Sequence, residues 1–94
     1  MPKGYWVAKA NILDDEKLSR YGKQAEIAIK KFGGKFLVRG GQHETKEGID
    51  FSRNVVVEFD SYDIALAAYS SSEYKKALAF LEGGAERMYA VVEG

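Results

Sequence analysis

The sequence changes twice from strand-like to helix-like hydrophobic periodicity and back, and few folds accommodate that alternation. Residues 5–12 are strand-like, and residues 18–32 then place apolar side chains at steps of three and four, as one face of a helix does. Residues 35–39 are strand-like again, and a polar, glycine-bearing loop follows them. The first half of the chain is therefore predicted to be a strand, a helix and a strand.

The second half repeats this order. Residues 54–59 are rich in β-branched side chains and form the strongest strand signal in the chain. A helix is predicted to begin after Ser61, to be interrupted at 70–72 and to continue to about residue 81. A last strand is predicted at about 86–92.

Local signals mark the ends of the first helix. Asp14 and Asp15 supply a cap and a negatively charged first turn. Gly33 and Gly34 follow the last apolar position, and glycine tolerates the left-handed conformation with which helices commonly end. These signals predict a helix that starts at about residue 15 and stops before residue 33.

The predicted order is βαββαβ. Two strand–helix–strand units with right-handed crossovers give a four-stranded antiparallel sheet of order 4-1-3-2. Both helices then cover the same face of the sheet and leave the other face bare. We expect an α+β, ferredoxin-like fold that makes one domain of residues 1–94.

Side chains alternate between the two faces of a strand, so the sequence also predicts what the bare face carries. The purely apolar sets, such as Trp6, Ala8 and Ala10, are assigned to the helix side. The mixed set assigned to the bare face comprises Tyr5, Val7, Lys9, Leu37, Arg39, Asn54, Val56 and Glu58. In the order 4-1-3-2, Lys9, Glu58 and Arg39 are expected to form one row.

The apolar members of this set would be exposed in a monomer, and such a patch usually marks an interface. A two-fold contact matches one surface with itself, so we expect a homodimer that stacks two bare faces. The charged row would then line a cavity between the two sheets. Two subunits arranged in this way form a dimeric α/β barrel.

Composition narrows the range of partners. Fourteen basic and fourteen acidic side chains cancel, so no net field favours nucleic acid or an anionic membrane. The chain has no cysteine, which excludes disulfides and thiolate chemistry. No signal-peptide core and no apolar run of roughly 20 residues are present. A cytoplasmic location is expected.

The whole chain resembles the domain of unknown function 1330 family, within the dimeric α/β-barrel superfamily. The matching positions are Gly4, Tyr5, Trp6, Tyr21, residues 33–41, Glu47, Gly48, residues 53–59, Tyr69, residues 72–74 and residues 91–94. The resemblance implies a ferredoxin-like subunit that dimerises sheet to sheet. It implies no activity, because superfamily relatives include cofactor-independent monooxygenases, isomerases, haem proteins and decarboxylating enzymes, and fold does not determine function.

His43 and Glu58 are the candidate catalytic residues. His43 is the only side chain that titrates near neutrality when unperturbed, so it is the natural general acid or base. Its simpler interpretation is an exposed loop residue. Glu58 would be a base in a partly dry cavity, and its simpler interpretation is a structural partner of Lys9 or Arg39.

The candidate ligand-binding residues are Arg39, Asn54, Arg53, Tyr5 and Lys9. Arg39 can clamp a carboxylate through its planar guanidinium, or form a salt bridge to Glu58 or across the dimer. The chain has one histidine and no recognisable spacing of metal ligands, so neither a metal nor a cofactor is predicted.

Three functions remain open from the sequence. The first is a homodimeric domain that binds a small organic molecule between the sheets. The second is an enzyme similar to the cofactor-independent monooxygenases or isomerases, acting on a small anionic or aromatic substrate. The third is a structural homodimer without a ligand.

Overall fold

The structure is a computed structural model, and it describes residues 2–94. Its elements in chain order are β1 (Gly4–Ile12), α1 (Asp15–Lys31), β2 (Lys35–Arg39), β3 (Arg53–Phe59), α2 (Tyr62–Tyr69), α3 (Ser72–Leu81) and β4 (Ala85–Glu93). All predicted elements are present, and their ends agree with the prediction to within one or two residues.

The helix ends follow the predicted capping chemistry. Asp14, Ser61 and Ser71 cap α1, α2 and α3, and each side chain accepts a hydrogen bond from the backbone N–H three residues later. The predicted interruption of the second helix therefore separates α2 from α3. At the end of α1, Gly33 has φ +72°, a left-handed conformation that glycine adopts readily.

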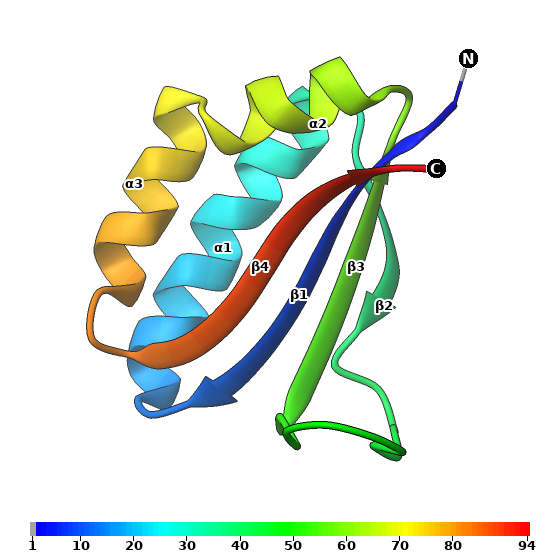
Figure 1. Cartoon of the computed structure of the whole chain (residues 1–94). Coiled ribbons are helices and arrows are strands. Elements are labelled where there is room, and N and C mark those ends of the chain that lie inside the picture. Colours follow the sequence, from blue (N-terminus) through cyan, green and yellow to red (C-terminus); the bar gives the residue numbers. More distant parts are fainter. Residues whose placement is uncertain (1) are drawn as a thin grey trace.

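The four strands form one antiparallel sheet in the order β2-β3-β1-β4, as predicted. All three helices cover the same face of this sheet, and the start of β1 lies beside the end of β4 (Figure 1). Within residues 2–94, no helix combines the length and apolarity that a membrane span requires. The architecture is the predicted α+β, ferredoxin-like fold.

An aromatic cluster forms the centre of the core between the sheet and the helices. Trp6 is only 1% exposed, and its indole N–H donates to the Ala65 carbonyl oxygen at 2.8 Å. The rings that surround Trp6, with centroids at 4.8–5.9 Å, belong to Phe59, Tyr69, Tyr74 and Tyr89. The indole N–H thus has a partner in an otherwise apolar environment, as a buried donor requires.

Strand pairing arranges the bare face in rows. The central row crosses all four strands and is wholly apolar: Val38, Val56, Val7 and Ala90. The rows on either side of it are Lys35, Glu58, Tyr5 and Val92, and then Asn54, Lys9 and Met88. Val38, Met88 and Val92 are 41%, 58% and 39% exposed, respectively. The bare face therefore carries exposed apolar surface, as the sequence predicts. Val7 and Val56 were expected there, whereas Val38, Met88 and Val92 were not in the predicted set.

The predicted row of Lys9, Glu58 and Arg39 is wrong. A register shift leaves Leu37 without a partner on β3, so Val38 pairs with Val56 and Arg39 pairs with Val55. Such a bulge adds one residue to one strand, and every side chain beyond it changes face. Arg39 consequently lies on the helix-covered face.

Candidate functional site

A cavity of about 370 Å³ lies between α1 and the helix-covered face of the sheet. It exists because α2 lies close against β1, β3 and β4, whereas α1 packs chiefly against α3. The residues that face each other across the gap are also small: Ala8 and Ala10 on β1, and Gly22 and Ala25 on α1. These side chains are too short to fill the space between the helix and the sheet.

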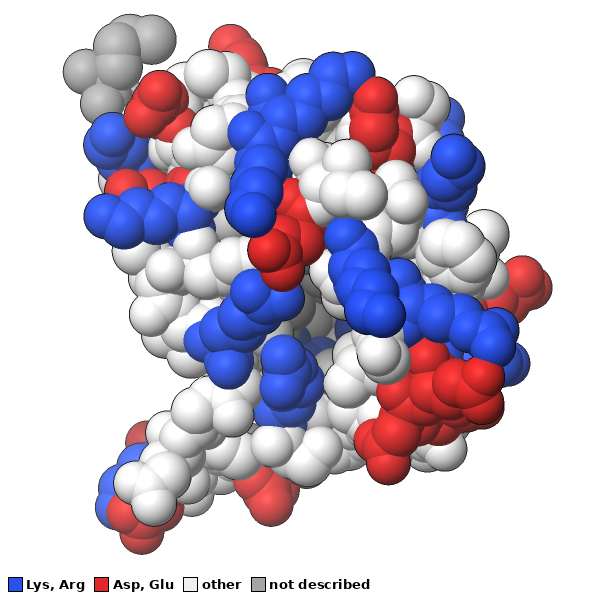
Figure 2. All heavy atoms as spheres, turned by 180° about the vertical axis from the view of Figure 1, so that it is seen from behind, with Lys and Arg blue, Asp and Glu red and all other residues white. Residues whose placement is uncertain are grey.

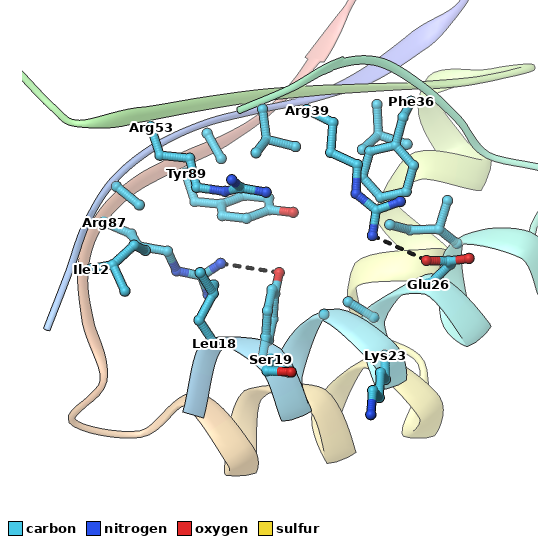
Figure 3. Close-up of a pocket in the computed structure, with 18 of the residues that line it drawn as sticks. Ile12, Leu18, Ser19, Lys23, Glu26, Phe36, Arg39, Arg53, Arg87 and Tyr89 are labelled. Carbon is cyan, nitrogen blue, oxygen red and sulfur yellow. Dashed lines mark hydrogen bonds and ion pairs between the residues drawn. The ribbon is translucent and has the colours of Figure 1, made fainter. Parts of the chain in front are cut away.

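Two rows of the sheet form the floor of this pocket. Arg39, Val55, Ala8 and Tyr89 are in register in one row, and Arg53, Ala10 and Arg87 are in register in the next. Three strands thus each contribute one arginine to the same cavity, and Figure 3 shows their guanidinium groups around it. Ile12, Leu18, Ile29, Phe36 and Val57 supply apolar walls.

The pocket is more positive than the chain as a whole. Its charged lining residues are Lys23, Arg39, Arg53, Arg87, Asp15 and Glu26. Four of these are basic and two are acidic, which leaves an excess of two positive charges in a chain of net charge zero. Figure 2 shows a hollow in the rear surface that is bordered mainly by lysine and arginine side chains.

Arg39 is held by a carboxylate. Its Nη2 donates to Glu26 Oε2 at 3.0 Å, and its guanidinium lies 4.1 Å from the centre of the Phe36 ring. Glu26 Oε1 also lies 3.2 Å from Lys30 Nζ. The hydrogen bonds from Arg39 and Lys30 lower the pKa of Glu26 below its ordinary value.

Arg87 is held by tyrosines. Its Nη1 donates to the Tyr21 hydroxyl at 3.1 Å, and its guanidinium carbon lies 5.0 Å from the Tyr21 ring centre and 4.9 Å from that of Tyr89. The Tyr21 and Tyr74 hydroxyls are 2.6 Å apart. Burial raises the pKa of both Tyr74 and Tyr89, so these phenols stay protonated at neutral pH.

Arg53 differs from the other two arginines. Its guanidinium points into the pocket (Figure 3), and nothing in residues 2–94 forms a side-chain hydrogen bond or ion pair with it. A Cβ atom at position 40 would overlap this guanidinium, so Arg53 occupies space that only a glycine at position 40 leaves free.

The predicted site residues are found in three separate places. Arg39 and Arg53 line the pocket. Tyr5, Lys9, Asn54 and Glu58 lie on the bare face, where the Tyr5 hydroxyl donates to Glu58 Oε2 at 3.4 Å. His43 lies in the loop between β2 and β3, with its Nε2 atom 3.8 Å from Asp50 Oδ1. The structure therefore does not bring His43, Glu58 and Arg39 together.

Sequence reasoning missed Arg87, Glu26 and Gly22. Arg87 alternates with Tyr89 and Val91 in the last strand, and a lone arginine on an otherwise apolar strand face is a signal of a pocket. Gly22 interrupts the apolar stripe of a long helix, where glycine is costly unless the missing side chain serves a purpose. No cluster of three or more potential metal ligands is found in the described part of the chain.

The chain is a protein of the ferredoxin-like α+β class, and it has a cationic cavity under α1. Residues 3–94 match the model of the family described as Domain of unknown function (DUF1330), and the chain belongs to this family. No curated protein matches the chain.

Solved structures of the same fold include proteins of unknown function. One from Rhodopseudomonas palustris has a TM-score of 0.78 at 12% identity, with 99% of this chain and 82% of that chain covered. A protein from Bacteroides fragilis NCTC 9343, described as dimeric and of ferredoxin-like fold, has a TM-score of 0.63 at 16% identity, with 98% and 96% covered.

An enzyme also shares the fold. SnoaB, a cofactor-independent oxygenase from Streptomyces nogalater, has a TM-score of 0.61 at 10% identity, with 100% of this chain and 94% of that chain covered. At these identities the likeness concerns the fold alone.

Proposed function

We propose that the chain forms a homodimer in which each subunit binds a small organic molecule in the pocket between α1 and the sheet. The observation that carries this proposal is an apolar cavity of about 370 Å³ into which three arginines project. Ligand pockets typically measure about 300–1,000 Å³ and combine apolar walls with a few convergent polar groups. The cavity has both properties.

Binding is a better-supported function than catalysis. Arg39 and Lys30 lower the pKa of Glu26, which makes this carboxylate a weak base. Burial raises the pKa values of Tyr74 and Tyr89, so neither phenol is ionised near neutrality. His43 is not among the residues that line the cavity. Because these residues supply the cavity with no strong general base, a reaction in the pocket would require a substrate that is itself acidic enough to lose a proton readily.

The enzymatic alternative is retained because SnoaB, described as a cofactor-independent oxygenase, has the same fold. A monooxygenase or isomerase of this kind would use the same pocket for a small anionic or aromatic substrate. In that case the arginines would bind the substrate, and the cavity would exclude water from it.

The homodimer is supported by the central row of the bare face, which is apolar across all four strands. The Bacteroides fragilis neighbour is described as dimeric, which supports the same assembly here. Because the pocket opens on the opposite face of the sheet, each subunit can bind its ligand independently of the dimer contact. The cytoplasmic location expected from the sequence remains a prediction.

Ligand binding in the pocket is tested with a variant whose larger side chain fills the cavity. Gly22 lines the cavity, and an added Cβ at this position meets no atom within 4 Å, so Gly22→Leu should occupy the pocket without removing a side chain. Gly22→Ala is the matched control, because it adds only one methyl group. Small aromatic acids, amides and alcohols at millimolar concentration would be screened by saturation-transfer NMR.

We expect at least one compound to bind the wild-type protein and the Gly22→Ala variant, and to bind the Gly22→Leu variant at least about tenfold more weakly. Circular dichroism would verify that both variants keep the native fold. Equal binding to the folded Gly22→Leu variant, or the absence of binding by every compound, would refute a ligand site in this cavity.

A further inference from the structure

Among the three arginines of the pocket, two already have partners and one does not. Arg39 donates to Glu26 at 3.0 Å, and Arg87 donates to the Tyr21 hydroxyl at 3.1 Å. Arg53 lines the same cavity and has no such partner anywhere in residues 2–94. A partly buried cation without a partner is costly, and an anion that enters the pocket would relieve that cost.

The strand register places Arg53 in the same row of the sheet as a second arginine. Arg53 and Arg87 are the two neighbours of Ala10, on either side of β1. Two strand spacings, about 9–10 Å, separate their backbones, and the Arg53 guanidinium lies toward Gly40 at the end of β2. Both arginines of this row line the pocket, whereas Glu26 is hydrogen-bonded to Arg39, in the neighbouring row of the sheet.

The position of Arg53 depends on Gly40. Gly40 has φ +68°, and its N–H donates to the Asn54 carbonyl oxygen at 2.9 Å, which holds the end of β2 against the start of β3. A Cβ at this position would overlap the Arg53 guanidinium. Glycine at position 40 thus suits the left-handed backbone conformation and leaves free the space that the Arg53 guanidinium occupies.

We propose that Arg53, placed by Gly40, binds the anionic group of the ligand, and that the ligand is a small organic carboxylate with an apolar body. The proposal rests on the binding function proposed above and names its ligand class. A guanidinium donates two parallel hydrogen bonds to a carboxylate, and the apolar walls of the cavity suit the remainder of the molecule. A phosphate ester carries close to two charges, which one free guanidinium matches less well.

The experiment compares carboxylates with their own primary amides, which have the same shape without the charge. Benzoate with benzamide, and salicylate with salicylamide, would be titrated into the wild-type protein and its variants, and the Arg53 Nε–Hε resonance would be followed by NMR. We expect each acid to bind the wild-type protein at least about tenfold more tightly than its amide, as is typical of a charge-assisted hydrogen bond.

Two sets of variants test whether Arg53 binds the carboxylate group and whether Gly40 positions it. Arg53→Met should abolish the preference for the acid, and Arg53→Lys should retain part of it, because lysine keeps the charge but loses the paired donors. Gly40→Ala should weaken acid binding about three- to tenfold by displacing the guanidinium. Gly48→Ala is the matched control, since Gly48 also has a positive φ of +87° but an added Cβ there meets no atom within 4 Å.

The two proposals fail in different ways. Compounds that bind the wild-type protein and bind the Gly22→Leu variant more weakly would support a ligand site in the pocket. If acids and amides then bind equally well, or if the Arg53→Met variant keeps the preference for acids, Arg53 does not bind the anionic group. If the Gly48→Ala variant loses acid binding as strongly as Gly40→Ala, the role assigned to Gly40 is wrong. If no compound binds at all, both proposals fail together.

Discussion

Three guanidinium groups enter one apolar pocket, and their partners differ in chemistry. Arg39 has a carboxylate, Arg87 has a phenol, and Arg53 has neither within residues 2–94. Charged groups differ in binding capacity according to how fully they are already paired. At the scale of single residues, the proposed ligand site should therefore depend on the partners of the arginines as much as on their number.

Glu26→Gln should strengthen the binding of anions. This change removes the charge that holds Arg39 and raises the net charge of the pocket lining by one. We expect acid ligands to bind about two- to fivefold more tightly, as one nearby exposed charge typically contributes, while their amides bind as before. NMR titration at low and high salt would measure this. Weaker acid binding in this variant would contradict the assigned role of Glu26.

Acid pH should lower the stability of the fold through protonation of Glu26. Because Arg39 and Lys30 lower the pKa of Glu26 in the folded state, this carboxylate contributes stability above its unfolded value of about 4.5. That contribution is lost as the pH falls through the lower, folded-state pKa. Urea unfolding curves between pH 3 and 6 should show a smaller loss of stability in Glu26→Gln than in the wild type, because glutamine does not titrate. Equal losses would contradict this coupling.

Alkaline pH should destabilise the fold through the buried tyrosines. Burial raises the folded-state pKa values of Tyr74 and Tyr89 above the ordinary value of 10.0. Above pH 10 the unfolded chain releases these protons and the folded chain keeps them, so stability falls by about 1.4 kcal/mol per pH unit for each such tyrosine.

Fluorescence of Trp6, the only tryptophan in the chain, would follow unfolding between pH 9 and 12. The Tyr74→Phe variant should be less stable at pH 7, because it loses the 2.6 Å hydrogen bond to Tyr21, but its stability should depend less steeply on alkaline pH. An identical slope in the two proteins would show that Tyr74 does not carry this effect.

At the scale of elements, α1 and β2 decide where the pocket is and what lines it. α1 stands off the sheet above small residues, and the bulge at Leu37 directs Arg39 toward α1. Each feature depends on one or two positions in the chain. Substitutions at those positions should therefore change the pocket without changing the topology.

Gly22→Ala should stabilise α1. Alanine in a helix interior is more favourable than glycine by about 0.5–1 kcal/mol, and the added methyl group meets no atom within 4 Å. Gly34→Ala is the contrasting variant, because its Cβ would lie 2.6 Å from the Ile29 Cγ2 atom and 2.7 Å from the Phe59 ring. We expect Gly34→Ala to cost about 1–3 kcal/mol by overpacking. Urea denaturation would measure both, and a destabilised Gly22→Ala protein would contradict the open space above Gly22.

At the scale of the whole molecule, the two faces of the sheet have separate roles in our proposal. The helix-covered face binds the ligand, and the bare face forms the dimer contact. The apolar central row of the bare face lies away from the pocket arginines, since the side chains of one row all project from the same face. Association and ligand binding should then be separable by mutation.

Ala90→Glu should convert the proposed dimer into a monomer. Ala90 is exposed on the bare face and in register with Val7, and a two-fold contact would bury the new charge twice. Sedimentation at micromolar concentrations should give twice the chain mass of 10.5 kDa for the wild type and one chain mass for the variant. Ile27→Glu, at an exposed apolar position of α1, is the control and should remain dimeric. A monomeric wild-type protein would refute the dimer.

Most of the fold could be predicted from the sequence because its signals are local. The cap at Asp14, the apolar stripe of α1 and the β-branched run in β3 each act within a few residues of chain. Right-handed crossovers then leave one sheet order, and the structure has that order. Trp6 and Ala8 were correctly assigned to the helix side by alternation alone.

The candidate site depended on the tertiary structure, for two physical reasons. The face on which Arg39 lies depends on a bulge at Leu37, and strict alternation predicts the opposite face. The cavity itself exists because α1 packs on α3 and stands away from the sheet, a distance that no periodicity in the chain encodes. The composition and order of residues thus determined the elements and their topology, whereas packing between elements decided that three arginines share one pocket and that His43 and Glu58 lie outside it.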